Sequence, residues 1–362
     1  MSKRVLILVP NDTLGGAEQH LKNIAIYMLG AGYSLDVFFL KKEITGAWRD
    51  LKGNVNFYFT NKEKEISGAF SCLGKLINNC NERYEYIFTS HVHLNSLAGL
   101  LIRCGLIKTR FFVGRESTSI FKRYQGRKLL FFKVLYKIGY SKLDLLICQT
   151  SYMREQLIMG LPNLASKINI QVIPNPINLK NIVLTDIEQR FQYSDFIVSA
   201  GRLIPEKGFD VLINAFAILK RKFPQLKLLI LGDGGERDKL NSLIEEFGLL
   251  EDVYLLGFKK NVYPYFLAAK SCVVSSRIEG FPNVLLQMMS QNDNVVSTLC
   301  AGGIADIPSI YTCEPNDVDE LAVQIENSLI NDNSFNREVF DDFLDKRSVP
   351  KFVEQINRFL NV

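Results

Sequence analysis

A pair of cations stands at an expected helix start in the second half of the chain. Arg202 and Lys207 lie in residues 200–208 (AGRLIPEKG), between a strand-like apolar run and an expected helix over residues 209–222. Free backbone N–H groups and the helix dipole already favour an anion at such a place. The two cations could therefore neutralise a diphosphate and stabilise it as a leaving group. Two solvated cations beside an ordinary loop would give the same pattern.

A carboxylate stands at a second expected helix start, in residues 275–287 (SSRIEGFPNVLLQ). Pro282 suits the first residue of a helix, where its missing N–H group costs nothing, and Gly280 lets the backbone approach a ligand closely. Glu279 could accept hydrogen bonds from sugar hydroxyls, and Gln287, about one and a half turns into the helix, could face the same cleft. Phosphate oxygens could be bound by the backbone N–H groups of Asn283, Val284 and Leu285. Alternatively, Glu279 serves only the helix dipole.

Two glycines follow the first apolar run. Gly15 and Gly16, in residues 11–18 (NDTLGGAE), open an expected helix and would let a phosphate or sugar approach the backbone. The G-x-G-x-x-G spacing of dinucleotide sites is absent here and in residues 232–235 (GDGG), and no G-K-[ST] occurs in the chain. These patterns disfavour a nicotinamide enzyme and an NTPase.

The elements that must position these residues are short apolar runs between helical patterns. They occupy residues 4–10, 35–41, 55–60, 84–90, 111–115, 143–150, 168–174, 196–202, 226–233, 253–258, 271–276 and 294–298. Near-continuous apolar runs are typical of parallel strands buried on both faces. Their alternation with helices predicts βαβ units and doubly wound α/β sheets.

The series restarts near Phe196, after the turn pair Asn175-Pro176 and a polar stretch at residues 178–195 that we interpret as a hinge. We therefore expect two Rossmann-like doubly wound parallel-sheet domains that face a central cleft. They would span residues 1–178 and 179–345, with a final helix over residues 346–362 packing back towards the first domain. Ligands of such sheets bind beyond the carboxyl ends of the strands.

Composition excludes several classes of protein. The chain has 362 residues, of which 47% are hydrophobic, and a net charge of +5, which is mild for a nucleic-acid binder. Its seven cysteines are scattered without a C-x-x-C pair, as in reduced cytosolic thiols, and His91 and His93 alone are a weak metal signal. We find no signal peptide and no apolar stretch long enough to span a bilayer, so we expect a cytoplasmic protein without a metal site.

In this order the segments resemble the retaining GT-B glycosyltransferases known as glycosyl transferases group 1, or family four. The matching elements are residues 15–18 (GGAE), 172–176 (VIPNP), 201–202 (GR) with 206–208 (EKG), 231–234 (LGDG), 256–258 (LGF), 279–283 (EGFPN) and 302–303 (GG). The resemblance covers most of the chain and is specific after Phe196. It implies transfer of a sugar from a nucleotide diphosphate donor with retention of configuration, without metal or other cofactor.

The resemblance also implies roles for individual residues. Arg202 and Lys207 would hold the diphosphate and, with Glu279 on the donor-sugar hydroxyls, would form the catalytic set. Gly15 and Gly16 would lie under the phosphates from the opposite domain, and the loop at Phe258 would lie near the base. The expected donor site thus comprises Gly15, Gly16, Arg202, Lys207, Phe258, Glu279, Gly280, Phe281, Pro282, Asn283, Val284, Leu285 and Gln287.

Two departures from the family pattern affect these expectations. Gln287 replaces the second glutamate of the family, which contacts the ribose hydroxyls, and the lost charge should cost about 1 kcal/mol of donor binding. A family histidine after a middle strand is replaced within residues 114–117 (GRES), where Arg115 and Glu116 could take over contacts at the reacting sugar. With His91 and His93, these two residues are the candidates on the acceptor side.

Residues 121–142 contain many cations and no acid. The cations are Lys122, Arg123, Arg127, Lys128, Lys133, Lys137 and Lys142, and aromatic and aliphatic residues stand between them. A basic amphipathic helix of this kind suits an anionic membrane surface, with about 1 kcal/mol from each basic residue near the surface. The helix could instead bury its apolar side in the first domain, and both roles are compatible.

These features together predict a hexosyltransferase-type glycosyltransferase that extends a lipid-linked oligosaccharide in bacterial surface polysaccharide (O-antigen or capsule) synthesis. We expect a UDP-sugar donor rather than a GDP-sugar, no nucleic-acid partner, and peripheral attachment to the inner face of the cell membrane. Two other functions fit the same architecture. A nucleotide-sugar epimerase would convert the donor without an acceptor, and a non-catalytic binding protein would bind the nucleotide sugar and release nothing.

Overall fold

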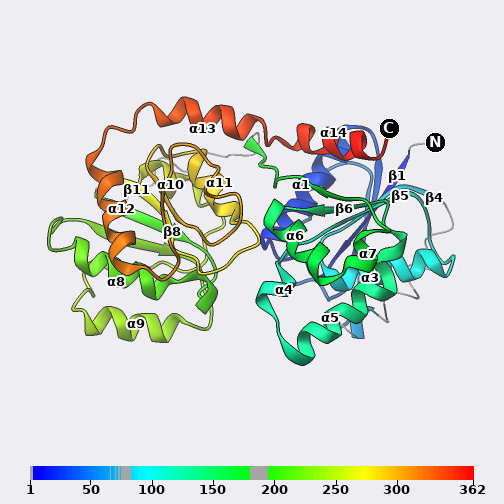
Figure 1. Cartoon of the computed structure of the whole chain (residues 1–362), viewed down its shortest axis with the longest axis horizontal. Helices are drawn as coiled ribbons and strands as arrows, with labels where there is room; N and C mark the ends of the chain where they lie inside the picture. The colour runs from blue at the N-terminus through cyan, green and yellow to red at the C-terminus, as the bar shows by residue number, and fades with distance from the viewer. Residues whose placement is uncertain (1–2, 66, 70, 72–73, 75–82, 180–194) are drawn as a thin grey trace. The chain divides into compact units, whose positions relative to one another are not determined.

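The structure is a computed structural model, and it describes residues 3–65, 67–69, 71, 74, 83–179 and 195–362. The chain forms two compact units (Figure 1). The first contains Met1–Pro176 and Val349–Val362, and the second contains Ile177–Ser348. The units thus meet in sequence at Pro176 and Ser348, where the sequence predicts boundaries at residues 178 and 345. Most of the predicted hinge at residues 178–195 lies outside the described residues.

The first unit has a seven-stranded sheet in the order β3-β2-β1-β4-β5-β6-β7, and every pairing in it is parallel. Its strands are β1 (Arg4–Val9), β2 (Ser34–Phe39), β3 (Val55–Phe59), β4 (Arg83–Thr89), β5 (Lys108–Arg115), β6 (Leu145–Cys148) and β7 (Ile170–Val172). Each coincides with a predicted run, because strands buried on both faces must be almost wholly apolar. The order reverses between β1 and β4, which makes this the switch point of the sheet.

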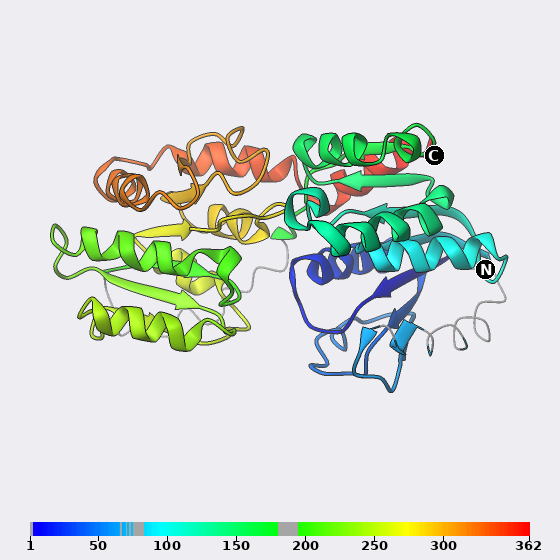
Figure 2. The same ribbon diagram turned by 60° about the horizontal axis from the view of Figure 1, so that its bottom comes forward.

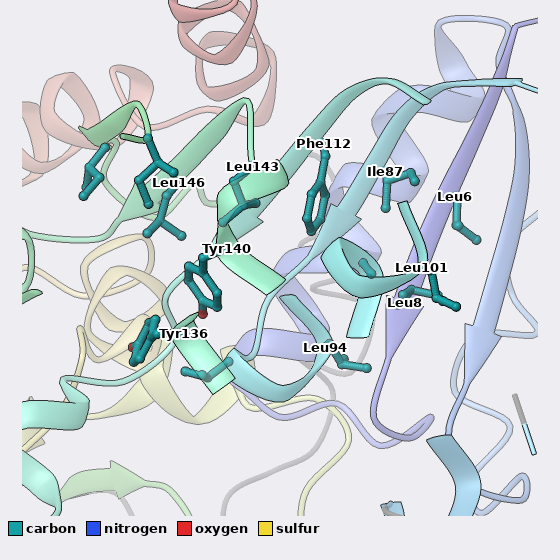
Figure 3. Close-up of a cluster of buried hydrophobic side chains, with 14 of the residues drawn as sticks. Leu6, Leu8, Ile87, Leu94, Leu101, Phe112, Tyr136, Tyr140, Leu143 and Leu146 are labelled. Carbon is teal, nitrogen blue, oxygen red and sulfur yellow. The ribbon is translucent and has the colours of Figure 1, made fainter. Parts of the chain in front are cut away.

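Helices cover both faces of this sheet (Figure 2). They are α1 (Gly16–Gly30), α3 (Val92–Arg103), α4 (Ile120–Arg123), α5 (Gly126–Gly139), α6 (Ser151–Gly160), α7 (Pro162–Ala165) and α14 (Val349–Phe359), with a 3-10 turn η1 (Tyr140–Lys142). One core cluster includes Leu94 of α3 and Tyr136 of α5 (Figure 3). The other lies against α1 and takes Phe352 and Ile356 from α14, so the C-terminal helix belongs to the first unit.

The single helix expected over residues 121–142 is wrong. Helix α4 ends at Arg123, Tyr124 and Gln125 are extended, and α5 begins at Gly126. The break lets the Tyr124 ring stack on Phe132, with 5.0 Å between the ring centroids. Gly126 has a φ of 56°, which favours glycine over residues with a side chain.

The second unit has a six-stranded parallel sheet in the order β10-β9-β8-β11-β12-β13. Its strands are β8 (Phe196–Ala200), β9 (Lys227–Leu231), β10 (Val253–Leu255), β11 (Ser271–Val274), β12 (Val295–Thr298) and β13 (Tyr311–Cys313). No strand is predicted at β13, because a run of three residues with a threonine in the middle is too short to stand out as apolar.

The helices of the second unit also lie on both faces of its sheet (Figure 2). They are α8 (Phe209–Leu219), α9 (Arg237–Glu246), α10 (Tyr263–Ala268), α11 (Asn283–Met289), α12 (Val318–Ile330) and α13 (Asn336–Asp345), with a 3-10 turn η3 (Pro205–Lys207). Helices α8 and α12 share one core cluster, whereas α10, α11 and α13 share the other.

Two expectations about the whole chain can be compared with this fold. Over the described parts of the chain, no helix has the length and apolarity needed to cross a membrane. The described cysteines are free thiols, namely Cys104, Cys148, Cys272, Cys300 and Cys313, whereas Cys72 and Cys80 lie outside the described residues.

Candidate functional site

The two charged motifs of the second unit lie against each other at the carboxyl ends of β8 and β11. Ser275 Oγ donates to the carbonyl oxygen of Lys207 at 3.0 Å, and the N–H group of Arg277 donates to the carbonyl oxygen of Glu206 at 2.8 Å. Strands β8 and β11 are neighbours in the sheet although β9 and β10 separate them in sequence. The sheet order therefore brings the two motifs together, at the edge where ligands of such sheets bind.

Glycine permits the close approach of the two motifs at Gly208, and it permits a second close approach, between the turns after β8 and β9, at Gly232. A Cβ atom on Gly208 would lie 2.2 Å from the carbonyl oxygen of Ser275, and Gly208 has a φ of 62°. A Cβ atom on Gly232 would lie 1.8 Å from the carbonyl oxygen of Gly201. Any side chain at either position would push neighbouring backbone segments apart.

Lys207 and Glu279 form a direct ion pair. Lys207 Nζ donates to Oε1 of Glu279, and Ser276 Oγ donates to the same oxygen at 3.1 Å. Their side chains are 18% and 19% exposed, so the pair is partly shielded but can be reached from solvent. The N–H group of Glu279 donates to the carbonyl oxygen of Cys300 at 2.9 Å, which fixes the backbone from which the carboxylate projects.

Arg202 precedes Lys207 in the same motif, in the turn after β8, and its side chain is exposed. Among the described residues the Arg202 guanidinium has no hydrogen-bond or ion-pair partner, so this group could bind an anion without giving up a contact. Lys207, in contrast, would have to exchange Glu279 for an anion. Binding of a diphosphate would thus break an existing ion pair at Lys207 but, within the described residues, no side-chain contact at Arg202.

The start of α11 differs in detail from the prediction. The helix begins at Asn283, and Pro282 is its N-cap with φ −76° and ψ 98°, so the expectation of Pro282 as the first helical residue is wrong by one position. The cap is extended because proline fixes φ but leaves ψ free. The N–H group of Leu285 donates to the carbonyl oxygen of Pro282 at 2.9 Å, so this bond would have to open before Leu285 could bind a phosphate.

Three further side chains of the expected donor site have different surroundings. Phe258 is 76% exposed after β10, whereas Phe281 is buried in the core cluster of α11, so of these two rings Phe258 is the one exposed to solvent. Gln287 Nε2 donates weakly to the hydroxyl of Tyr263 at 3.4 Å. Burial raises the pKa of the Tyr263 phenol, which therefore stays protonated.

Gly15 and Gly16 lie where the sequence predicts, at the start of α1. Gly15 is the N-cap, and the Glu18 carboxylate folds back so closely that a Cβ atom on Gly15 would lie 2.6 Å from Oε2. The other oxygen, Oε1, lies 3.7 Å from Nε2 of His91. Glu18 is missing from the predicted site, although an acid at the third helical position is a known capping signal.

The two acceptor-side histidines lie at the end of β4. His91 is the N-cap of α3, and its ring centroid lies 5.5 Å from that of His93. Burial, followed by the nearby charges of His93 and Arg115, lowers the pKa of His91 to about 3. Burial also lowers the pKa of His93, against the opposing effect of Glu65. His91 is therefore neutral, so its ring could take part in hydrogen bonds but cannot supply a positive charge.

Arg115 and Glu116 are both buried, with exposures of 3% and 1%. The Arg115 guanidinium donates to Ser90 Oγ at 2.8 Å and to Asn175 Oδ1 at 2.6 Å. Burial lowers the pKa of Arg115 to about 9. Arg115 thus ties the end of β5 to the end of β4 and to the predicted motif at residues 172–176.

The Glu116 carboxylate is bound on both oxygens. The hydroxyl of Tyr136 donates to Oε2 at 2.8 Å, and that of Tyr140 donates to Oε1 at 2.6 Å. Burial raises the pKa of Glu116 to about 7, although the two phenols act in the opposite direction. Glu116 therefore anchors α5 and η1 to the sheet. Sequence reasoning missed both tyrosines, since they stand within an apolar and basic stretch that carries no site signal.

The described residues include no group of three or more His, Cys, Asp or Glu side chains that could hold a metal ion.

Comparison with known proteins identifies the family. Residues 185–340 match the family described as glycosyl transferases group 1, and residues 14–181 match glycosyltransferase family 4. The chain is 31% identical over 206 residues to an uncharacterised glycosyltransferase of Methanocaldococcus jannaschii, covering 55% of this chain and 50% of the relative. It is 33% identical over 225 residues to a Campylobacter jejuni enzyme named N-acetylgalactosamine-N,N'-diacetylbacillosaminyl-diphospho-undecaprenol 4-alpha-N-acetylgalactosaminyltransferase, covering 62% and 60%. The chain thus spans only about half to three fifths of the length of these relatives.

Solved structures agree on the fold. Anabaena HepE in complex with UDP-glucose has a TM-score of 0.80 at 22% identity and covers 99% of both chains. Sucrose-phosphate synthase from Thermosynechococcus elongatus has a TM-score of 0.77 at 17% identity and covers 99% of this chain and 98% of its own. With its two parallel-sheet α/β units, the chain belongs to the GT-B glycosyltransferases of group 1.

Proposed function

We propose that this protein moves a sugar from a UDP-sugar to a lipid-linked oligosaccharide in bacterial surface polysaccharide (O-antigen or capsule) synthesis, with retention of configuration and without a metal ion. The observation that carries the proposal is the Lys207–Glu279 pair at the carboxyl ends of β8 and β11, with the Arg202 side chain, unpartnered among the described residues, in the turn after β8. A cation for a diphosphate and a carboxylate for sugar hydroxyls thus meet at one edge of one sheet.

In this reaction the departing diphosphate carries the developing negative charge, and Arg202 and Lys207 stabilise it. These two cations supply the charge compensation that a metal ion supplies in other transferases. The diphosphate itself stabilises the oxocarbenium-like sugar on the face that the acceptor hydroxyl then attacks, and it accepts the proton that this hydroxyl loses, so the configuration is retained. Glu279, once released by Lys207, accepts hydrogen bonds from hydroxyls of the donor sugar.

The choice of substrates draws on similar proteins. The solved Anabaena protein contains UDP-glucose, which supports a UDP-sugar here. The Campylobacter jejuni relative is named for a diphospho-undecaprenol substrate, which supports a lipid-linked acceptor. We place the donor on the second unit and the acceptor on the first, where His91 and His93 offer neutral imidazoles to a glycan while Arg115 and Glu116 hold the strand ends beneath them.

Attachment to the membrane is the third part of the proposal. Four exposed apolar side chains follow one side of α5, namely Leu130, Phe131, Val134 and Ile138. Its other side packs on the core through Leu129, Phe132, Leu135 and Tyr136. The exposed cations Arg127, Lys128 and Lys137 stand on the same helix. We propose that this exposed side of α5 rests on the anionic inner face of the cell membrane.

Donor screening with product analysis tests the function. The purified chain is heated with a panel of UDP- and GDP-sugars, since a bound ligand raises the unfolding temperature by mass action. The stabilising donor is then incubated with lipid-linked oligosaccharides, with and without EDTA, and the new linkage is analysed by NMR. We expect stabilisation by a UDP-sugar and an EDTA-resistant product that retains the donor configuration.

The remaining outcomes separate the rival functions. Conversion of the donor sugar without any acceptor would identify an epimerase. Stabilisation without release of nucleotide from any donor would identify a binding protein. If no nucleotide sugar stabilises the chain and none is consumed, the proposed function is wrong.

A further inference from the structure

Arg277 stands two residues before Glu279 and makes four side-chain hydrogen bonds. Its Nη1 donates to the carbonyl oxygen of Pro205 at 2.6 Å and to Asp210 Oδ1 at 2.8 Å. Its Nη2 donates to Asp210 Oδ2 at 2.6 Å, and its Nε donates to Asn316 Oδ1 at 2.6 Å. Such a two-pronged arginine–carboxylate contact has a fixed geometry as well as strength.

These contacts join the two halves of the Lys207–Glu279 pair. Pro205 begins the turn η3 that ends at Lys207, and Asp210 lies in the first turn of α8 directly after it. The backbone N–H group of Arg277 also donates to the carbonyl oxygen of Glu206 at 2.8 Å. The turn that carries Lys207 is thus tied, through side chain and backbone, to the loop that carries Glu279.

The charge of Arg277 is already compensated. The hydrogen bonds that Arg277 donates to Asp210 raise the pKa of Arg277 against the effect of burial. For Asp210, burial raises the pKa, but the contacts with Arg277 outweigh it and the pKa is lowered. Both groups therefore stay ionised and matched to each other, whereas the Arg202 guanidinium has no partner in the described part of the chain. Arg277 would have to give up several of its four hydrogen bonds to bind a diphosphate, whereas Lys207 would give up only one side-chain contact, so Arg277 is unsuited to be a third diphosphate cation.

We propose that Arg277, through Asp210 and Pro205, is a positioning residue that holds Lys207 and Glu279 at a fixed separation when the donor parts them. This inference rests on the proposed function. Entry of a diphosphate takes Lys207 from Glu279, so the direct contact between these two side chains is lost at the moment when their spacing matters. The Arg277 contacts do not involve either side chain, and they remain.

The expected consequence is a loss of turnover with little loss of ground-state binding. In Arg277→Met, Lys207 and Arg202 still bind the diphosphate, so the affinity for UDP and the KM for the donor stay within about threefold. A misplaced catalytic group can cost on the order of a hundredfold in rate, so kcat falls by about tenfold to a hundredfold. Arg277→Lys keeps the charge but loses the two-pronged contact, and its kcat lies between those of Arg277→Met and the wild type.

The experiment compares these variants with a remote control. Lys220 also ties a carboxylate to a backbone carbonyl, since its Nζ donates to Asp252 Oδ1 at 2.7 Å and to the carbonyl oxygen of Leu226 at 3.1 Å. It lies before β9, at the amino edge of the sheet. Lys220→Met should lower the unfolding temperature as Arg277→Met does, yet leave kcat unchanged. Asp210→Asn removes the partner charge with little change of shape, and it serves if Arg277→Met does not fold.

The readouts are kcat and KM for the donor, UDP affinity by calorimetry, and unfolding temperature. The inference is supported if kcat falls in Arg277→Met and in Asp210→Asn while UDP affinity holds, and if a variant that carries both substitutions loses no more kcat than Arg277→Met alone. It is overturned if the wild type is active and kcat changes less than threefold, or if UDP affinity falls in parallel with kcat. A wild type without turnover on any donor removes the proposed function, and this inference with it.

Discussion

The ammonium group of Lys207 donates a hydrogen bond to Oε1 of Glu279, a residue 72 positions further along the chain. The predicted diphosphate cation and the predicted sugar-binding carboxylate therefore neutralise each other. Ser276 Oγ donates to the same carboxylate oxygen at 3.1 Å. Glu279 thus occupies the position at Lys207 that an anionic ligand would take.

This pairing predicts opposite effects on binding and on turnover. Lys207→Ala and Glu279→Ala should abolish transfer and leave the fold intact. Glu279→Gln should also lose transfer, but UDP should bind to it about fivefold more tightly, because a competing ion pair worth about 1 kcal/mol has been removed from Lys207. Calorimetric titration with UDP and steady-state assays measure the two effects. Near-normal turnover by either alanine variant would contradict the assignment of these residues to the active site.

Gly208 should tolerate no side chain. In Gly208→Ala the new Cβ atom would lie 2.2 Å from the carbonyl oxygen of Ser275 at a φ of 62°, and the second unit should lose about 3 kcal/mol of stability. Gly235→Ala is the matched control, since a Cβ atom there meets nothing within 4 Å. Calorimetry is the suitable measurement, because the one tryptophan of the chain, Trp48, lies in the first unit. Equal stability of the two variants would contradict the prediction.

Glu116 should make the stability of the first unit depend on pH. Burial raises its pKa to about 7 in the folded state, above the ordinary value of about 4.3. The stability that Glu116 contributes is therefore fully present below about pH 4.3 and is lost as pH rises through 7, a change of up to about 4 kcal/mol. In Glu116→Gln the free energy of unfolding should fall less steeply between pH 4.5 and 8 than in the wild type. Urea unfolding followed by Trp48 fluorescence measures this.

The control for this prediction is Glu354→Gln, which removes an exposed carboxylate of the same unit on α14. The free energy of unfolding of Glu354→Gln should change with pH as steeply as that of the wild type. The same slope in Glu116→Gln and the wild type would mean that Glu116 is not held protonated by the fold.

The exposed side of α5 should bind anionic vesicles. In Leu130→Ser with Phe131→Ser, binding to vesicles that contain phosphatidylglycerol should fall at least about tenfold, because two apolar side chains no longer enter the lipid surface. The unfolding temperature should not change, since both side chains are more than half exposed. Ile330→Ser removes a side chain that is 61% exposed on α12 of the second unit, and it is the matched control. Equal vesicle binding by control and double variant would rule out α5 as the contact.

Gln287 should limit nucleotide affinity. Gln287→Glu restores the charge that a ribose hydroxyl can bind, and it should tighten UDP binding by about fivefold, corresponding to about 1 kcal/mol. Tyr263→Phe removes the weak 3.4 Å contact of Gln287 and should change affinity little. Calorimetric titration distinguishes the two. Weaker binding by Gln287→Glu would mean that the ribose lies elsewhere.

The sequence by itself determined the sheets and the residue types of the site. The predicted runs coincide with β1 to β12, because a strand buried on both faces must be apolar along its whole length. The helix starts at Gly16, Phe209 and Asn283 carry local signals in glycine, proline and charge, and these were found to within one residue. Strand runs and helix starts depend on residues that are close together in sequence, so they can be recognised from the sequence alone.

Only the tertiary structure decided which side chains meet. Lys207 pairs with Glu279, and Arg277 with Asp210, because β11 lies next to β8 in the sheet, and local sequence carries no record of that order. Tyr136 and Tyr140 close on Glu116 because α5 folds back over the end of β5, which turned a candidate at the reacting sugar into a buried anchor. Contacts between distant residues follow from packing, and packing is a property of the whole fold.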